Sequence, residues 1–129
     1  MNAVRIRHSG WPDRHADIDN IAFRVSLDDT ATVLHMGDAH TDPKMFDRRA
    51  DYWAERPMNL ALPPYWFFTS NGGRQVLEDH IHADETLGVH VPASMPDRPS
   101  QYPEELRGRN LLSVPGEEKR IPIFDNVSN

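Results

Sequence analysis

The chain has 129 residues and a mass of 14.8 kDa, which is the size of one domain. Its net charge of −6 argues against a nucleic acid or an anionic membrane surface as a partner. It contains no cysteine, which excludes disulfides, thiolate zinc sites and cysteine nucleophiles, so catalysis would have to use His, Asp, Glu, Ser or a metal ion. No apolar run approaches the ~18 residues of a membrane span, and residues 1–7 lack the apolar segment of a signal peptide. We therefore expect a cytoplasmic protein.

The first third of the sequence predicts three strands. Residues 3–8 alternate apolar and polar side chains, which is typical of a short strand. Residues 21–27 show the clearest alternation, and residues 31–36 follow after a turn, so the two segments predict an antiparallel hairpin. The apolar face of the first hairpin strand carries Ile21, Phe23, Val25 and Leu27.

The next segments predict a helix and a buried strand. Asp42 as N-cap and Pro43 at the first helical position predict a helix that ends before Pro57. Residues 59–62 (NLAL) form a short, mainly apolar run that is followed by two prolines, which indicates a short buried strand. An aromatic run follows at residues 65–68.

Further along, residues 71–73 predict a loop and residues 74–81 a second helix. Residues 86–91 predict another strand, with His90 on the face opposite the apolar side chains. Because helices and strands alternate through the middle of the chain, the sequence predicts an α/β layered fold.

The C-terminal third is rich in proline. Residues 92–103 hold four prolines in twelve positions, which predicts a loop without regular structure. Residues 104–107 predict one helical turn. Residues 111–114 and 120–124, joined through residues 115–117, predict a closing hairpin.

Three polar residues follow the ends of predicted strands. His8 ends the first strand, Asp38 follows the hairpin and His90 lies near the end of the segment at residues 86–91. Open α/β sheets place their ligands at such strand ends, and imidazoles with a carboxylate are preferred ligands of Zn²⁺, Fe²⁺ or Mn²⁺. A single residue of this kind at a strand end is more often a structural residue that is satisfied by its neighbours.

The segments around these residues resemble a known family. The sequence VLHMGDA at residues 33–39 is similar to the strand and Gly-Asp element of the metallo-β-lactamase superfamily. HSG at residues 8–10, followed by NIAFRV at residues 20–25, resembles its His-Ser element and the next strand. LGVHVP at residues 87–92 looks like the strand that carries the last metal-binding His, and VPGE at residues 114–117 looks like the closing hairpin. These elements occur in the family's order.

The LPPYW run at residues 62–66 resembles the lactonase-like branch of that superfamily. The resemblance implies that residues 1–129 form one partial domain, the C-terminal half of an αββα sandwich with a Pro-rich loop within it. It implies that His8 binds a first metal, His90 a second metal, and that the catalytic Asp38 bridges both. The metal, expected to be zinc and otherwise manganese or iron, would activate water against a small-molecule ester, lactone, lactam or phosphodiester.

The sequence departs from the family in one large respect. The family's His-x-His-x-Asp-His motif precedes the His8 element, and here only seven residues stand before it. The ligands that complete either metal are therefore missing from this sequence. A near-match, HIHADE at residues 80–85, stands in the wrong order with Glu85 at the last His position, and we interpret it as chance.

Two further groups have alternative interpretations. Tyr65 and Trp66 either belong to the core or line the substrate cleft. His40 either supports the metal ligands or is simply exposed. His35, opposite its strand neighbours, is expected to be structural.

Three hypotheses follow for the whole chain. The first is a metal-dependent hydrolase domain that is incomplete by itself. The second is a non-catalytic half-fold or interaction module without metal, and the third is an unrelated small α/β binding domain. Because half a sandwich leaves an apolar sheet face uncovered, we expect either a homo-oligomer or a complementary chain that supplies the N-terminal half.

Overall fold

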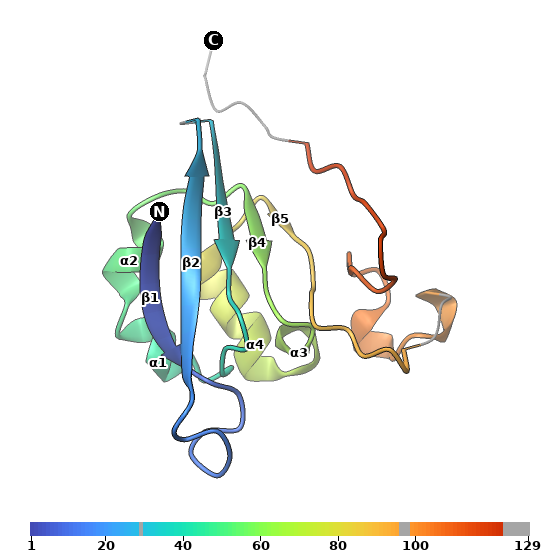
Figure 1. The fold of residues 1–129 in the computed structure, drawn as a ribbon, viewed down its shortest axis with the longest axis horizontal. Helices are drawn as coiled ribbons and strands as arrows, with labels where there is room; N and C mark the ends of the chain where they lie inside the picture. Colours follow the sequence, from blue (N-terminus) through green and yellow to red (C-terminus); the bar gives the residue numbers. More distant parts are fainter. Residues whose placement is uncertain (29, 96–98, 123–129) are drawn as a thin grey trace.

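The computed structural model describes residues 1–28, 30–95 and 99–122. Figure 1 shows the elements in chain order. They are β1 (Asn2–Arg7), β2 (Asp19–Leu27), β3 (Ala31–His35), α1 (Pro43–Asp47), α2 (Ala50–Ala54), β4 (Leu60–Leu62), α3 (Trp66–Thr69), α4 (Asn71–Val76), the π-helix η1 (Leu77–Ile81), β5 (Glu85–Thr86), and the 3₁₀ turns η2 (Pro99–Gln101) and η3 (Glu104–Leu106).

The strands form one mixed sheet in which the spatial order, β1-β2-β3-β4-β5, is also the order of the chain. The pairs β1/β2 and β2/β3 are antiparallel, whereas β3/β4 and β4/β5 are parallel. The predicted hairpin is confirmed, because Phe23 lies opposite His35 and Leu27 opposite Ala31. With helices connecting the parallel strands, the fold belongs to the α/β class.

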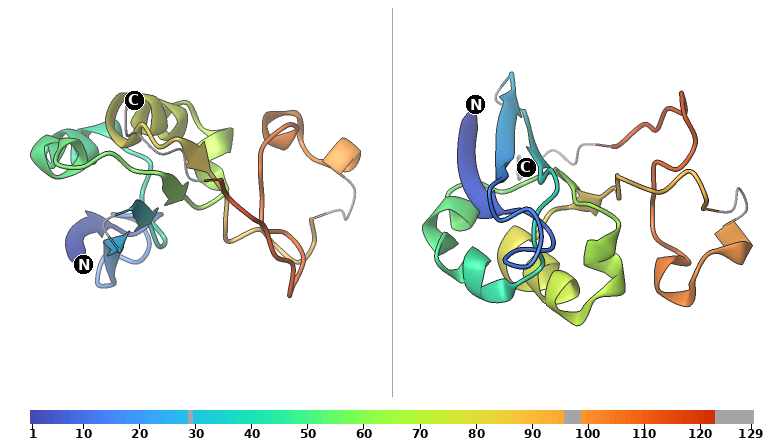
Figure 2. Two further views of the ribbon diagram at one scale, coloured as in Figure 1. Left: turned by 90° about the horizontal axis from the view of Figure 1, so that it is seen from above. Right: turned by 60° about the horizontal axis from the view of Figure 1, so that its bottom comes forward.

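All the helices between β3 and β5 lie on one face of this sheet (Figure 2). That face is packed: Ile6, Leu34 and Ala61 are at most 3% exposed. The helices contribute five buried side chains to the same core, namely Phe46, Trp53, Phe67, Val76 and Ile81. No helix in the described part of the chain is long and apolar enough to cross a bilayer.

The opposite face of the sheet is uncovered, and we call it the bare face. It is the face of β2 that carries Ile21, Phe23, Val25 and Leu27. Ile21, Phe23 and Leu27 are 44%, 37% and 51% exposed. Side chains of this size are normally buried, so the exposed row along β2 is an uncovered apolar stripe of the sheet.

The first helical segment differs from its prediction in one respect. Asp42 is the N-cap, because its carboxylate accepts the Lys44 N–H at 3.0 Å, and Pro43 is the first helical residue, as predicted. The helix nevertheless breaks into α1 and α2 at Arg49, whose φ of −117° and ψ of 27° are not helical. The break lets the Trp53 indole N–H donate to the Phe46 carbonyl at 3.0 Å while both rings enter the core.

The loop predicted at residues 71–73 is wrong. The Ser70 hydroxyl accepts the Gly73 N–H and caps α4, which begins at Asn71. The helix then continues into η1 and ends at His82, whose φ is +49°. The aromatic run before it forms α3.

The strand predicted at residues 86–91 is much shorter than expected, since β5 ends at Thr86. Beyond Thr86 the pairing continues without a regular strand, through the Leu87 N–H to the Ala61 carbonyl, the Val89 N–H to the Pro63 carbonyl and an isolated bridge between Val89 and Pro64. The physical reason lies directly after β4, where Pro63 and Pro64 carry no N–H groups and so interrupt the hydrogen-bond ladder.

The closing hairpin is also absent from the described residues. Leu111 forms a single bridge with Gly88, and residues 112–122 contain no strand, while residues 123 and 124 lie outside the described part. The Glu117 carboxylate accepts hydrogen bonds from the N–H groups of Ser113 and Val114. These two N–H groups are therefore not available to pair with a second hairpin strand. This segment is anchored instead by a second core cluster of Phe68, Tyr102, Leu106 and Leu111.

Candidate metal centre

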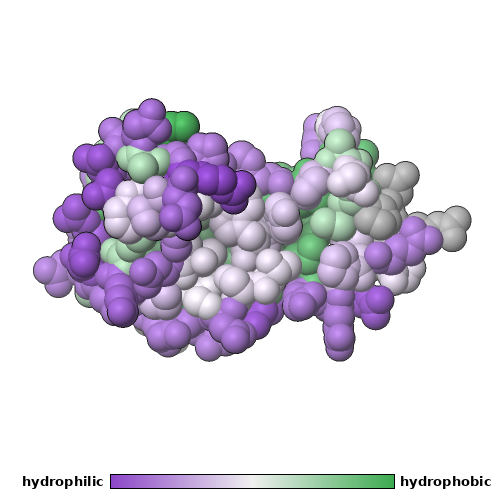
Figure 3. Space-filling model, turned by 90° about the horizontal axis from the view of Figure 1, so that it is seen from below, coloured by the Kyte–Doolittle hydropathy of each residue, from purple (hydrophilic) through white to green (hydrophobic). Residues whose placement is uncertain are grey.

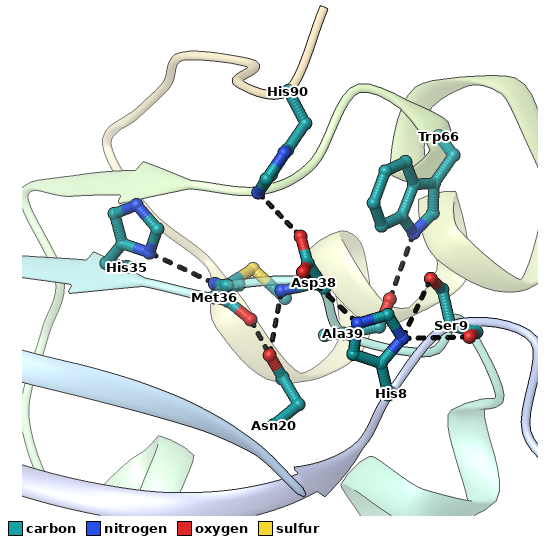
Figure 4. Close-up of polar contacts among 10 residues, drawn as sticks. His8, Ser9, Asn20, His35, Met36, Asp38, Ala39, Trp66 and His90 are labelled. Atoms are coloured by element: carbon teal, nitrogen blue, oxygen red, sulfur yellow. Dashed lines mark hydrogen bonds and ion pairs between the residues drawn. The ribbon is translucent and has the colours of Figure 1, made fainter. Parts of the chain in front are cut away.

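The structure brings His8, Asp38 and His90 together at the end of the sheet where β3 finishes (Figure 4). Asp38 lies between the two imidazoles. Its Oδ2 is 3.2 Å from Nε2 of His8, and its Oδ1 is 2.6 Å from Nε2 of His90. The side chain of His8 is 14% exposed, whereas those of Asp38 and His90 are 37% and 45% exposed. The cluster is therefore open to solvent on the side of His90.

Asp38 is positioned by contacts of its backbone. Its N–H donates to the side-chain oxygen of Asn20 at 2.8 Å, and its carbonyl accepts the Ser9 N–H at 2.8 Å. Asn20 is itself 7% exposed and donates to the Met36 carbonyl. The turn between Met36 and Asp38 requires Gly37, because its φ is +63° and an added Cβ would stand 2.5 Å from the Asn20 oxygen.

The hydrogen bonds of His8 define what its ring can do. Nδ1 lies 2.9 Å from the Ser9 carbonyl and 3.4 Å from the Ser9 hydroxyl, and Nε2 lies 3.2 Å from Oδ2 of Asp38. The carbonyl accepts a proton from Nδ1 and the hydroxyl can donate one to it, so each tautomer of the ring has a partner there. With the proton on Nε2, the ring donates a hydrogen bond to Asp38; with the proton on Nδ1, the Nε2 lone pair can bind a metal ion.

His90 stands in an unusual backbone conformation. Its φ is +62°, in the left-handed region that non-glycine residues rarely adopt and that costs of order 1 kcal/mol or more. The conformation follows directly after the interrupted pairing of β5 and turns the imidazole toward Asp38. The His90 ring also lies 5.8 Å from the indole of Trp66, whose N–H donates to the Ala39 carbonyl.

The donor set fits a divalent metal in its chemistry, but the spacing of the donor atoms is that of hydrogen bonds. Two ligands that share a tetrahedral zinc ion at about 2.0–2.2 Å stand roughly 3.3–3.6 Å apart. The 3.2 Å between His8 and Asp38 lies just below this range, and the 2.6 Å between His90 and Asp38 is a short hydrogen bond. Within residues 1–28, 30–95 and 99–122, no group of three or more His, Cys, Asp or Glu side chains is arranged to hold a metal ion. The two imidazoles contact different oxygens of Asp38 rather than one common point.

The three weaker lining candidates lie in different surroundings. Trp66 and His40 line a small hollow of about 200 Å³ together with Ser9. The ring of His40 is fully engaged, because Nε2 donates to the Trp11 carbonyl and Nδ1 accepts the Asp42 N–H. Tyr65 packs against the cluster around Phe68.

The remaining histidines considered from the sequence are held outside this cluster. His80 pairs with Asp47 at 2.6 Å, and His82 is hydrogen bonded to the Asp79 carbonyl. His35 is exposed and accepts the Gly37 N–H, which is a structural role. The motif-like run at residues 80–85 thus directs its two imidazoles to separate local partners.

Sequence reasoning missed three residues that shape the cluster. Asn20 and Ser9 hold Asp38 through backbone contacts, and the ring of His15 lies 4.5 Å from that of His8. Asn20 and Ser9 do lie within the segments that carry the family resemblance, but nothing in the sequence indicated these contacts.

Comparison of the chain with family models, with curated proteins and with solved structures gives no match. The functional interpretation therefore rests on the residues and the geometry described above.

Proposed function

We propose that this chain supplies half of a two-metal hydrolytic centre of the metallo-β-lactamase type, built on the C-terminal half of an αββα sandwich. In this proposal His8 and Asp38 hold one metal ion, and Asp38 and His90 hold the other. The observation that carries the proposal is the place of Asp38 between the two imidazoles, with Oδ2 facing His8 at 3.2 Å and Oδ1 facing His90 at 2.6 Å.

The residues of the chain have separate roles in this proposal. Asp38 offers one oxygen to each imidazole, so it can hold two cations at once. The Ser9 carbonyl accepts from Nδ1 of His8 in the tautomer that leaves Nε2 available as a ligand. A bound divalent metal supplies an activated water and a Lewis acid for attack on a carbonyl or phosphoryl group. The exposure of Asp38 and His90 leaves room for a substrate to approach.

Two ligands for each metal fall short of the three that catalytic zinc sites use. The proposal therefore assigns the missing ligands to a complementary polypeptide. The bare face is the natural place for its sheet, because two sheets in a sandwich pack face to face about 10 Å apart. The expected metal is zinc, with manganese or iron as alternatives.

A zinc titration followed by NMR tests this proposal. With ¹⁵N-labelled histidine, we expect Zn²⁺ to shift the ring nitrogens of His8 and His90 at weak affinity, and the Asp38→Ala variant to lose this response. Asp47→Ala is the matched control, since it removes a carboxylate from a His–Asp pair of the same 2.6 Å length elsewhere on the molecule. It should leave the response of His8 and His90 unchanged.

Turnover completes the test. The chain with Zn²⁺ or Mn²⁺ should hydrolyse a model lactone no faster than the metal in buffer. Tight stoichiometric binding with turnover that depends on Asp38 would show that the centre is complete in this chain, contrary to the proposal. If the same titration with Zn²⁺, Mn²⁺ or Fe²⁺ gives no response of His8 and His90, the hydrolase interpretation is wrong.

One observation favours a second candidate function, an interaction module that needs no metal. The His90 imidazole is hydrogen bonded directly to Asp38 at 2.6 Å. This bond satisfies both side chains without a metal ion between them. In that case the cluster ties the end of β1 to the segments after β3 and β5, and the bare face is the functional surface. Metal titration separates the two candidates.

A further inference from the structure

A hollow of about 310 Å³ lies along β1, the first strand of the sheet, where α1 meets α2. Figure 3 views the molecule from the end of the sheet where β3 finishes, and the surface on the side of β1, α1 and α2 is mainly hydrophilic. The hollow is lined by Arg5, Ile6, Arg7, Met45, Arg48 and Arg49. Four of its six lining residues are therefore arginines, which come from two separate parts of the chain.

These arginines gather in a chain that is acidic as a whole, with 20 Asp and Glu against 14 Lys and Arg. Like charges that share one hollow repel each other unless an anion neutralises them. Arg5 forms an ion pair with Asp19 at 2.5 Å. Among the residues that the structure describes, Arg7, Arg48 and Arg49 form no ion pair. Three positive charges thus line the hollow without a carboxylate of the described chain to balance them.

The backbone around the hollow is held by contacts that do not involve a ligand. Ile6 is 3% exposed and belongs to the main core. At the break between α1 and α2, the Arg49 N–H donates to the Phe46 carbonyl at 3.0 Å, and the Arg49 carbonyl accepts the Tyr52 N–H at 3.0 Å. The break is therefore fixed from both helices. The two walls exist before a ligand binds, as in a largely preformed ligand site.

Arginine side chains determine the chemistry of a ligand that would fit here. A guanidinium group donates hydrogen bonds in a planar fork that matches the oxygens of phosphate or carboxylate. A phosphate monoester carries a charge of about −1.5 to −2 and three acceptor oxygens on one atom, whereas a carboxylate carries one charge and two oxygens. Three arginines without a carboxylate partner therefore favour a phosphoryl group.

The size of the hollow limits the rest of the ligand. A volume of about 310 Å³ lies at the lower end of the roughly 300–1,000 Å³ typical of ligand sites. The net charge of −6 opposes the approach of a long polyanion such as a nucleic acid. Both observations favour a small, soluble phosphate ester.

We propose that this hollow binds the phosphoryl group of a small phosphate monoester, with Arg7, Arg48 and Arg49 as the hydrogen-bond donors. None of the three residues of the candidate metal centre lines the hollow. The inference therefore goes beyond the proposed function and does not depend on a metal ion.

Glycerol 3-phosphate is a suitable probe at pH 8, where a phosphate monoester is a dianion. A titration at constant ionic strength and without metal, followed by ¹H–¹⁵N NMR, should give saturable shifts at the amides of Ile6, Arg48 and Arg49. Glycerol should give none. Malonate has two negative charges but no phosphoryl group, and it should bind about fivefold more weakly or less.

Variants test which arginines bind the probe. Arg48→Gln and Arg49→Gln should each weaken binding by about fivefold or more, because each removes a charged donor. Arg120→Gln is the matched control, since Arg120 is also exposed and lies outside the hollow, so binding should be unchanged.

Asp19→Asn provides a test in the opposite direction. It removes the carboxylate that pairs with Arg5 and should strengthen binding, by about twofold or more, because a fourth guanidinium becomes free. A decrease in affinity would contradict the proposed role of the arginines.

Four further results would overturn the inference: no saturable shifts, malonate binding as tight as that of glycerol 3-phosphate, an equal loss of affinity in Arg120→Gln, or shifts confined to residues outside the hollow. A twelve-nucleotide DNA strand provides the last comparison. If it binds more tightly than glycerol 3-phosphate and loses affinity in Arg48→Gln, the hollow is part of a nucleic-acid surface and the assignment to a small ester is wrong.

Discussion

Asn20 shapes the candidate centre without contributing a ligand to it. Its side chain bridges the Met36 carbonyl and the Asp38 N–H, so it connects β2 to the turn that carries the bridging carboxylate. Because the residue is 7% exposed, neither partner gains a full contact with water if the amide is removed. A buried polar group that loses its partner costs about 1–3 kcal/mol.

We therefore expect Asn20→Ala to lower the free energy of unfolding by about 1–3 kcal/mol and to abolish the zinc response of His8. Denaturant unfolding measures the first effect and ¹⁵N-histidine NMR the second. Asn59→Ala is the matched control: Asn59 also joins two segments, through Thr32 and Asp84, but away from Asp38. It should reduce stability and keep the zinc response. An Asn20→Ala protein with an unaltered response would contradict the positioning role.

Glu117 is a second single residue whose contribution to stability should depend on pH. The backbone N–H groups of Val114 and Ser113 hold the pKa of its carboxyl below the ordinary value of about 4.5, because they stabilise the ionised form. The folded state thus favours the carboxylate, so this contribution to stability is present above pH 4.5 and is lost as the pH falls through the lowered pKa. Glu117→Gln should be less stable than the parent chain at pH 7, and the difference should vanish in acid. Thermal melts at pH 7 and pH 3 measure it, and a constant difference would contradict the assignment.

The sequence placed His8, Asp38 and His90 near one another from their positions at strand ends, and the structure brings these residues together. Their role as metal ligands remains a prediction. The roles of Asn20 and Ser9 could not be predicted, because both residues contact backbone atoms of Asp38. Every residue has these backbone atoms, so the sequence gives no sign of such contacts. The left-handed conformation of His90 was also invisible, since histidine in a strand-like run gives no signal of it.

At the scale of elements, the turn after β3 is sensitive to the smallest change of side chain. Gly37 and Gly116 both have positive φ values, +63° and +82°. They differ in their surroundings, because a Cβ on Gly37 meets the Asn20 oxygen at 2.5 Å, whereas a Cβ on Gly116 has no atom within 4 Å. The pair therefore separates backbone strain from steric contact.

We expect Gly116→Ala to cost about 1–2 kcal/mol, the usual penalty of the left-handed region. Gly37→Ala should cost clearly more, because either Asn20 or the turn must move in addition. Urea denaturation of the two variants measures the difference in the free energy of unfolding. Equal losses would mean that the turn accommodates the methyl group freely.

The elements that could be predicted from the sequence are those with a local pattern of residue types. The strict alternation of apolar and polar residues was sufficient to predict β2, and Asp42 followed by Pro43 was sufficient to predict the start of α1. The short β5, the break between α1 and α2 and the missing hairpin near residue 117 depend on contacts between segments. They are decided by the two prolines that follow β4, by the hydrogen bond from Trp53 to Phe46 and by the Glu117 carboxylate. The sequence of one segment does not show which hydrogen bonds the neighbouring segment makes.

For the whole molecule, the bare face predicts association. Ile21, Phe23 and Leu27 are about half exposed, and each leaves of order 1 kcal/mol of burial unused. Total stabilities are only about 5–15 kcal/mol, so covering this row is a substantial gain. We expect the isolated chain at micromolar concentration to form dimers or larger species above 14.8 kDa.

Light scattering of a Phe23→Asp variant tests this expectation. A charge in the centre of the bare face should shift the protein toward the monomer. Val114→Asp, which adds the same charge away from the sheet, should leave the mass distribution as it was. A monomeric parent chain with a cooperative melt would show that the bare face needs no cover, and it would weaken the half-sandwich proposal.

The coincidence of spatial and sequential order in the sheet has a consequence for how the molecule assembles. Each strand pairs with the one made just before it, so the sheet can grow from β1 to β5 without any later strand inserting between earlier ones. Pairing of sequence neighbours keeps loop-closure costs small and favours rapid folding. The candidate centre forms later than the first strand pairs, because His8 is synthesised early and His90 is synthesised much later. The sheet can thus begin to form early in synthesis, while the cluster at its end closes only when residue 90 arrives.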